Sequence, residues 1–355
     1  MIRAKTIDRE FRFQRPATTS RGTYLTKKVH FIVLYHSDDP SVAGIGECSF
    51  LPGLSIDNVK GYREKLNLTI DRINQGDYYT DTSLTDWPSI SFGLETAWKD
   101  IRTSGSKILY PSDFTEGKDS IDINGLIWMD SKEEMIRQIR QKIDDGFTCL
   151  KMKIGKLDLE EELDILRYIR SQYNADHLEL RVDANGAFKL PQVEMILKIL
   201  SEFDLHSIEQ PIAAGHPEAL ARLCELSPIP IALDEELIGK HSTAARRKLL
   251  DTIKPQYLVL KPGLLGGMSA CKDWISLAEE RKIGWWVTSA LETNIGLNAI
   301  AQWTYTLNNS VYHGLSTGLL FVNNIPSPLY LHGERLYYDP DRKWNLSGLE
   351  DPTNP

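Results

Sequence analysis

Short, mainly apolar runs, each followed directly by a charged residue, recur through the middle of the chain. They are residues 147–150 before Lys151, 178–182 before Asp183, 205–208 before Glu209, 229–233 before Asp234 and 257–260 before Lys261. From Asp183 onward these charged residues are 26, 25 and 27 positions apart, close to the length of one strand, one helix and two loops. The pattern predicts a (β/α) barrel with charges at the carboxyl ends of its strands, where barrel active sites lie.

Helical patterns fill the gaps between these runs. Residues 131–134, Ser-Lys-Glu-Glu, form a capping box, apolar residues follow at helical spacing, and Gly146 ends the helix. Similar patterns predict helices at 159–169, 191–203, 217–225, 242–253, 268–281 and 294–307, and strands at 284–289 and 311–315. The alternation favours a parallel barrel over a sandwich or a bundle. An open doubly wound sheet also alternates, but it does not account for charges at so many successive strand ends.

The ends of the chain do not follow this repeat. Residues 1–120 are expected to form an α+β capping domain, completed by residues 323–355, and residues 121–322 the barrel. The expected elements of the first region are strands at 29–35 and 44–48 joined by a turn at 37–40, a helix at 88–101, and loops at 14–24 and 49–55. Short strands at 327–338 are expected to return to the first domain. The two loops are either part of a binding site or ordinary surface connections.

Composition narrows the class of protein. The net charge is −8, whereas nucleic-acid-binding surfaces are usually basic. No run of 18 apolar residues predicts a membrane span, and the amino-terminal residues lack an apolar signal core. The four cysteines have no CxxC spacing and are expected to be reduced, mostly buried thiols of a cytoplasmic protein. The histidines show no HExxH pattern, which argues against a histidine zinc site.

Three carboxylates, Asp183, Glu209 and Asp234, end successive predicted strands. Neighbouring strands lie about 5 Å apart, so three such side chains can converge on one cation. Oxygen ligands with room for water and substrate favour Mg²⁺, with Mn²⁺ as a substitute, over zinc. Capping of the next helix explains one such carboxylate more readily than three in step. Asn185 and Glu235 follow two of the carboxylates and are expected to hydrogen-bond to the ligands and to nearby lysines.

Three lysines are expected at the same end of the barrel. Lys151 and Lys153 are two residues apart on one strand and therefore point the same way, while the residues that alternate with them are apolar. Two inward ammonium groups are expected to lower each other's pKa, which suits a lysine that acts as a base. Lys261 comes from across the barrel. The Gly-rich stretch after it lacks the residue order of a phosphate-binding loop.

These residues resemble the enolase superfamily, in its muconate-lactonizing branch. The matching motifs are Lys-Met-Lys at 151–153, Arg-Val-Asp-Ala-Asn at 181–185, Ile-Glu-Gln-Pro at 208–211, Leu-Asp-Glu at 233–235 and Lys-Pro-Gly at 261–263. The resemblance covers nearly the whole chain. It implies a modified (β/α)7β barrel with a capping domain, a Mg²⁺ site and a lysine base that acts on the proton next to a carboxylate.

Three further tracts, at 46–53, 289–296 and 313–321, narrow the resemblance to members of this branch that dehydrate a cyclic carboxylate. It implies loss of water from 2-succinyl-6-hydroxy-2,4-cyclohexadiene-1-carboxylate in menaquinone synthesis, with Lys153 as base and Lys261 over the opposite face. It also implies that the two loops of the first domain close the barrel mouth. The implied substrate contacts are Arg21, Phe50, Leu51, Pro52, Gly53, Ser289 and Leu291. Gly186 and Glu236 differ from the residues found at these positions in several relatives, which have glutamine and a small residue there. These differences bear on substrate specificity and leave the metal site intact.

Two alternatives remain open at this point. An N-acylamino-acid racemase or dipeptide epimerase of the same superfamily needs the same two lysines, Lys153 and Lys261, one on each face of the α-carbon. A barrel that binds metal as an inactive scaffold is the non-enzymatic alternative, and the presence of all three carboxylates and all three lysines argues against it. A small carboxylate is the expected substrate, and the sequence leaves the oligomeric state undecided.

Overall fold

A computed structural model describes residues 1–19, 22–77, 84–316 and 320–349. Seven parallel strands form one curled sheet in the order β11-β10-β9-β8-β7-β6-β5. They are β5 (Gly125–Ile127), β6 (Cys149–Lys153), β7 (Glu179–Asp183), β8 (Ser207–Glu209), β9 (Ile231–Leu233), β10 (Tyr257–Leu260) and β11 (Gly284–Val287). The predicted (β/α) barrel is therefore confirmed.

The two ends of the curled sheet meet through residues 313 and 314. His313 forms a parallel bridge to Ile123, and Gly314 forms one to Thr288. The ring of His313 adds a further link, because its Nδ1 accepts a hydrogen bond from the backbone N–H of Val287 at 3.0 Å. The strand expected at 311–315 is thus reduced to two bridges in the described structure, with a side chain supplying part of the closure.

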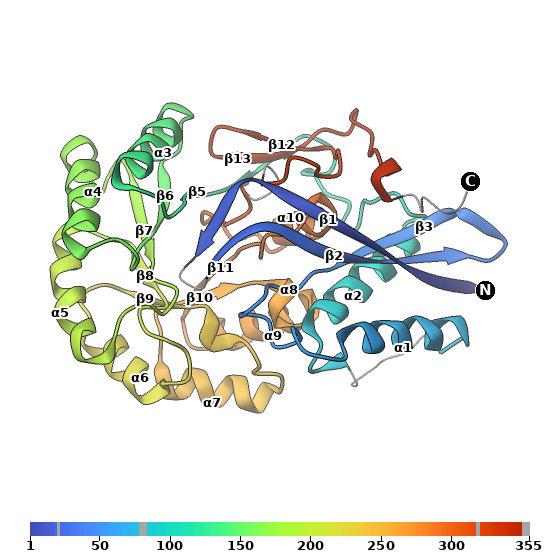
Figure 1. The fold of residues 1–355 in the computed structure, drawn as a ribbon, viewed down its shortest axis with the longest axis horizontal. Helices are drawn as coiled ribbons and strands as arrows, with labels where there is room; N and C mark the ends of the chain where they lie inside the picture. Colours follow the sequence, from blue (N-terminus) through green and yellow to red (C-terminus); the bar gives the residue numbers. More distant parts are fainter. Residues whose placement is uncertain (20–21, 78–83, 317–319, 350–355) are drawn as a thin grey trace.

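Helices follow the barrel strands and cover the outside of the sheet, as Figure 1 shows. They are α3 (Lys132–Asp144), α4 (Leu159–Gln172), α5 (Leu190–Leu200), α6 (Pro217–Leu226), α7 (Thr243–Ile253), α8 (Pro262–Leu265), α9 (Met268–Glu279) and α10 (Asn294–Tyr305). The predicted capping residue Ser131 accepts a hydrogen bond from the N–H of Glu134 at 3.3 Å. No helix in the described residues is both long and apolar enough to cross a membrane.

The amino-terminal region is an antiparallel sheet with two helices. Its strands are β1 (Ile2–Thr19), β2 (Gly22–His36) and β3 (Asp39–Cys48), and its helices are α1 (Tyr62–Asn74) and α2 (Pro88–Arg102). Helix α2 lies so close to β3 that a Cβ atom on Gly46 would collide with the carbonyl of Gly93. The expected return strand and second helix are confirmed, although β3 begins at Asp39, within the stretch predicted as a turn.

The interpretation of residues 14–24 as a loop is wrong over its described part. The β1–β2 pairing shifts register between Arg12 and Ala17 and then resumes with Ala17 opposite Tyr24. Apolar side chains hold this outer part of the hairpin in place, since Phe13 and Ala17 are buried in a cluster with Phe321. Because this stretch is polar and contains a proline, its sequence did not indicate a β-strand ladder interrupted by one irregularity. Figure 1 shows the β1–β2 ribbon extending from the sheet toward the barrel.

The carboxyl-terminal strands do not join the amino-terminal sheet. β12 (Leu329–His332) and β13 (Arg335–Tyr338) form a hairpin, and β13 pairs with β4 (Ile121–Asp122), which leads into the barrel. The segments on either side of the hairpin do reach the first region, because Phe321, Ile325 and Leu349 belong to its apolar core. The expected return to the capping domain is thus made by packing and not by strand pairing.

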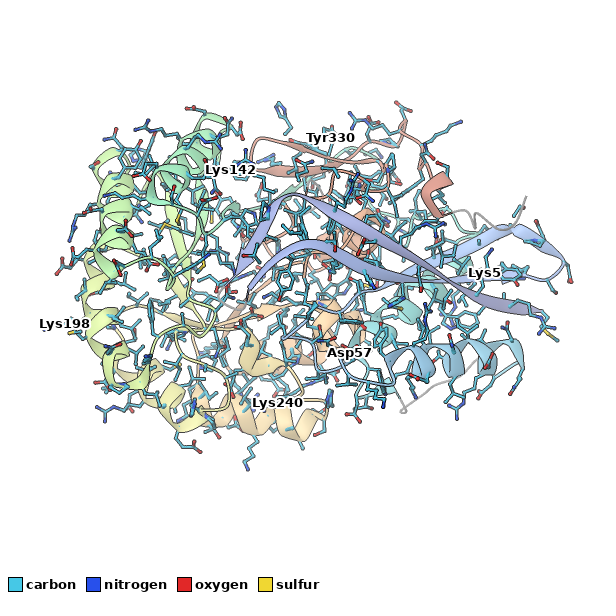
Figure 2. The ribbon with its side chains drawn as sticks, in the orientation of Figure 1. Lys5, Asp57, Lys142, Lys198, Lys240 and Tyr330 are labelled. Carbon is cyan, nitrogen blue, oxygen red and sulfur yellow. The ribbon has the colours of Figure 1, made fainter. Side chains whose placement is uncertain are left out.

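Two carboxylates of the amino-terminal region cap helices of the barrel. Glu95 on α2 accepts a hydrogen bond from the N–H of Met268 at 2.7 Å, at the start of α9. Glu47 on β3 accepts from the N–H groups of Thr293 and Gly296 at the start of α10. These contacts satisfy helix N–H groups that would otherwise lack partners. In Figure 2, Lys5 and Lys198 mark the opposite ends of the two regions that these contacts join.

Candidate active site

The three predicted carboxylates lie side by side at one end of the barrel. Asp183 ends β7 and Glu209 ends β8, and the two residues are register partners in the parallel pairing. Asp234 follows β9 directly. All three side chains are buried, with residue exposures of 0%, 2% and 2%. The local cause is similar for each: a short buried strand leads to the mouth of the barrel, and the carboxylate is the last residue of that strand or the first residue after it.

Three lysines pair with these carboxylates. Nζ of Lys151 lies 2.9 Å from Oδ2 of Asp183 and 2.5 Å from Oε2 of Glu209. Nζ of Lys153 lies 2.6 Å from the same oxygen of Asp183, and Lys261 pairs with Asp234 from the far side. Strands β6 and β10, which carry or precede these lysines, are separated by three strands in the sheet, so the ammonium groups approach the centre from opposite walls.

The charges in this cluster shift each other's pKa in opposite directions. Burial raises the pKa of Asp183, but Lys151 and Lys153 outweigh burial and hold it well below its ordinary value. Burial and the neighbouring Asp183 raise the pKa of Glu209 to about 8. Burial lowers the pKa of Lys151, but Asp183 and Glu209 raise it above its ordinary value. The expectation of a lowered pKa for Lys151 is therefore wrong here, because two carboxylates lie within contact distance.

The donor set fits a hard divalent cation. Three carboxylates on adjacent strands supply the oxygen ligands that Mg²⁺ prefers, and buried Oε1 of Glu209 accepts no hydrogen bond from any described residue. The lysines pair with these carboxylates in the structure. Among the described residues, no group of three acidic, histidine or cysteine side chains is arranged to hold an ion. The metal site at Asp183, Glu209 and Asp234 thus stays a prediction that the chemistry of the side chains supports.

Asn185 connects Lys153 to Asp183, and Glu235 is bound to Asn185. Oδ1 of Asn185 accepts a hydrogen bond from Lys153 at 2.7 Å, and its backbone N–H donates to Asp183. Its side-chain amide donates to Glu235 at 3.2 Å. Asn185 has a φ of 45°, a left-handed conformation that asparagine tolerates better than most residues. The local backbone turn therefore places one amide between Lys153, the proposed base, and Glu235, which lies just after β9.

A pocket opens above this cluster and contains many of the predicted residues. Lys151, Lys153, Lys261, Asn185, Glu235, Leu51, Ser289 and Leu291 line it. Phe50 instead packs against Tyr62 in the capping domain, with ring centroids 4.7 Å apart. The carbonyl of Pro52 accepts a hydrogen bond from Tyr24, and Gly53 takes a left-handed turn conformation. Arg21 lies outside the described residues.

Sequence reasoning missed much of the pocket wall. The missed residues are Tyr24, Leu54, Asn124, Leu126, Trp128, Thr288, Ala290, Gly314 and Ser316. All nine are uncharged. Ala290, Gly314 and Ser316 lie within the tracts 289–296 and 313–321, which carried the narrower resemblance without pointing to these residues as contacts. The carboxyl end of β5, near Leu126 and Trp128, could have been flagged from the strand-end rule alone.

Gln210 was also missed. It has a φ of 40°, and its side-chain Oε1 accepts hydrogen bonds from the N–H groups of Asp234 and Glu236, each at 3.2 Å. It thereby holds the turn that carries one of the three carboxylates. The departure noted at Glu236 also has a structural use, since its carboxylate accepts from the N–H of Gly215 at 2.9 Å.

A curled parallel barrel with acidic and lysine side chains at its strand ends, beside a separate α+β region, defines an acid–base enzyme of the enolase type. The chain belongs to the enolase superfamily, and residues 134–335 match the family described as Enolase C-terminal domain-like.

Full-length relatives agree with this assignment. The chain is 43% identical over 352 residues to an o-succinylbenzoate synthase of Desulfotalea psychrophila, covering 90% of this chain and 95% of that protein. The crystal structure of MenC from Desulfotalea psychrophila superposes with a TM-score of 0.82 at 39% identity, covering 95% of this chain and 99% of that one. The L-Ala-D/L-Glu epimerase of Bacillus subtilis, at 18% identity and 95% coverage of both chains, shares the fold with a TM-score of 0.79.

Proposed function

We propose that this chain is an o-succinylbenzoate synthase. It removes water from 2-succinyl-6-hydroxy-2,4-cyclohexadiene-1-carboxylate to give 2-succinylbenzoate, a carbon–oxygen lyase reaction of menaquinone synthesis. The observation that carries the proposal is the pair Lys153 and Lys261, which line one pocket from opposite barrel walls beside three buried carboxylates. The end-to-end likeness to an o-succinylbenzoate synthase supports this choice of substrate.

Lys153 carries out both proton transfers. In its neutral form its amine takes the proton from the ring carbon next to the carboxylate, and the electrons of the broken C–H bond move into the carboxylate as an ene-diolate. The same ammonium then gives a proton to the departing hydroxyl on the same face, so that the C–O bond breaks and water leaves. One residue suffices because both groups leave from one face of the ring.

Asp183, Glu209 and Asp234 are the residues that would hold Mg²⁺, or Mn²⁺ as a substitute. When bound, the cation supplies positive charge that stabilises the developing negative charge on the substrate carboxylate. Asn185 positions Lys153 through the 2.7 Å hydrogen bond. A lysine with a fixed second partner has fewer orientations to lose when it reaches the substrate.

Lys261 does not need to move a proton in this reaction. It approaches from the wall opposite Lys153 and is half-buried beside Asp234. Its ammonium group is suited to lie over the second face of the ring-derived anion, where a desolvated cation stabilises both the charge and the π system. Tyr24 of β2 and two residues of the 49–55 loop, Leu51 and Leu54, line the pocket and exclude water from that face.

Racemisation or epimerisation of an acylated amino acid is the second candidate function. The same geometry favours it, because a lysine on each face of the α-carbon is what a two-base proton exchange requires. The deciding assay compares two activities of the purified enzyme in the presence of Mg²⁺. One is dehydration of the cyclohexadiene carboxylate, and the other is racemisation or epimerisation of N-succinylamino acids or dipeptides. A dehydration kcat/KM that exceeds the racemisation value supports the proposal, and racemisation without dehydration overturns it.

The partner and compartment follow from the same reasoning. The enzyme is proposed to act on a small dicarboxylate in the cytoplasm, where four free, buried cysteines stay reduced.

A further inference from the structure

A buried lysine of the capping domain lies against the back of one pocket wall. Nζ of Lys27, on β2, donates hydrogen bonds to the carbonyl oxygens of Ala290 at 2.9 Å and Leu291 at 2.7 Å. Only 5% of Lys27 is exposed. Ala290 and Leu291 are on the barrel side of the interface, and both line the pocket. An ammonium group of the capping domain therefore holds two successive carbonyls of the active-site wall.

Two buried carboxylates, Glu292 and Glu47, act on this lysine through their charge and bind the backbone of the same segment. Glu292 turns back so that Oε2 accepts a hydrogen bond from the N–H of Ala290 at 2.5 Å. Glu47 accepts from the N–H of Thr293 on the other side of the same segment. Burial lowers the pKa of Lys27, and the charges of Glu292 and Glu47 offset part of that effect. The buried charge is thus compensated, as a stable buried ion requires.

The held segment adopts a conformation that it would not keep unaided. Leu291 has a φ of 62°, in the left-handed region that a branched residue rarely occupies. Its carbonyl and the preceding one are the two that Lys27 binds. The second oxygen of Glu292, which accepts no hydrogen bond within the described structure, is near Gly263, where an added Cβ would come within 2.7 Å of it. Gly263 is two residues after Lys261.

We propose that Lys27, supported by Glu292 and Glu47, is a positioning residue that fixes the wall from Ser289 to Leu291 and thereby sets how tightly the pocket holds its substrate. The substrate-related part of this statement rests on the proposed dehydration. Lys27 does not touch the reacting atoms, since its ammonium faces backbone carbonyls. Its effect is therefore expected on KM more than on kcat, and on the mobility of the segment even without substrate.

The test uses three variants of the full chain. Lys27→Met keeps the length of the side chain and removes both hydrogen bonds. Lys28→Met is the matched control, because Lys28 is the exposed neighbour on the same strand. The double variant Lys27→Met with Glu292→Gln removes a buried charge of each sign. Each variant is measured for thermal midpoint, for amide hydrogen exchange of residues 289–293, and for kcat and KM at saturating Mg²⁺.

Lys27→Met is expected to speed exchange across residues 289–293 and to raise KM about tenfold, the effect of losing hydrogen bonds from a charged donor. Its kcat should stay within about threefold of wild type, and Lys28→Met should match wild type throughout. The double variant should recover thermal midpoint but keep the raised KM and the fast exchange.

The proposal is overturned if residues 289–293 of Lys27→Met exchange their amide hydrogens at the wild-type rate. It is also overturned if the double variant recovers the wild-type KM together with the wild-type thermal midpoint. In either case the cluster only stabilises the fold. If Lys27→Met does not fold, the double variant carries the same comparison. If wild-type enzyme fails to dehydrate the substrate while exchange responds as expected, the proposed function falls and the positioning of the segment stands.

Discussion

Nζ of Lys153 lies 2.6 Å from Oδ2 of Asp183, its register partner on the neighbouring strand. The proposed base and a proposed metal ligand are thus held at the same level of the barrel by one pair of parallel strands. A one-residue slip between β6 and β7 would turn Lys153 away from the pocket. The Lys153–Asp183 pair therefore depends on the register of these two strands.

Replacing Lys153 tests the assignment of the base. Lys153→Ala should lower kcat about 10²–10⁴-fold, the usual contribution of general acid–base catalysis. Lys261→Ala should also lose turnover while still exchanging the substrate α-proton in D₂O, because Lys153 remains. Lys198→Ala, on exposed α5, is the control. Near-normal dehydration by Lys153→Ala would mean that another group removes the proton.

Removing one carboxylate tests the metal site. Asp183→Asn, Glu209→Gln and Asp234→Asn should each weaken Mg²⁺ binding and remove most activity, since each deletes an anionic oxygen ligand. The measurement is activity against Mg²⁺ concentration after EDTA treatment, with exposed Glu218→Gln as the control. Full activity of EDTA-treated enzyme that holds no metal by elemental analysis would rule out the site.

The 49–55 loop is expected to set substrate preference. Leu51 is an apolar residue that lines the pocket, so Leu51→Ala should change the ratio of kcat/KM values between competing substrates by about tenfold and leave Mg²⁺ affinity unchanged. Leu68→Ala, on the exposed face of α1, should leave the ratio at its wild-type value. If Leu51→Ala also leaves it unchanged, the loop is only a connection.

Acid should weaken the closure of the barrel. Burial lowers the pKa of His313 to about 4, helped by the nearby charge of Arg181. Between pH 6.5 and about 4 the unfolded chain binds a proton that the folded protein refuses, so stability is lost as pH falls through this window, by up to about 3 kcal/mol.

His313→Gln, which cannot titrate, should be less stable than wild type at pH 7 and should lose that difference toward pH 4. Denaturant unfolding of both proteins at each pH gives the comparison. Other titrating groups, such as Glu292, whose pKa is raised to about 7, contribute equally to both proteins, so their effect cancels when the two free energies of unfolding are subtracted. A constant difference across the window would show that His313 does not carry this dependence.

The sequence predicts the barrel and its charged centre well because both depend on local order. A buried strand ending in Asp183 or Lys261 gives a readable repeat, and the barrel then brings the ends together. The role of Lys27 could not be predicted from local sequence order. Its partners are more than 260 positions along the chain, and nothing near Lys27 distinguishes it from exposed Lys28. The outer β1–β2 ladder was missed for a related reason, since its support comes from distant Phe321.

The carboxylates of Glu95 and Glu47, which cap α9 and α10, have a consequence for how the chain folds. Two regions joined only by a linker can unfold one at a time, but here each region completes the other's hydrogen bonding. A barrel cut free of residues 1–120 would leave two helix starts without acceptors, next to the segments that carry Lys261 and Leu291. The catalytic half is therefore not a separable module, and we expect it to unfold together with its cap in one cooperative transition.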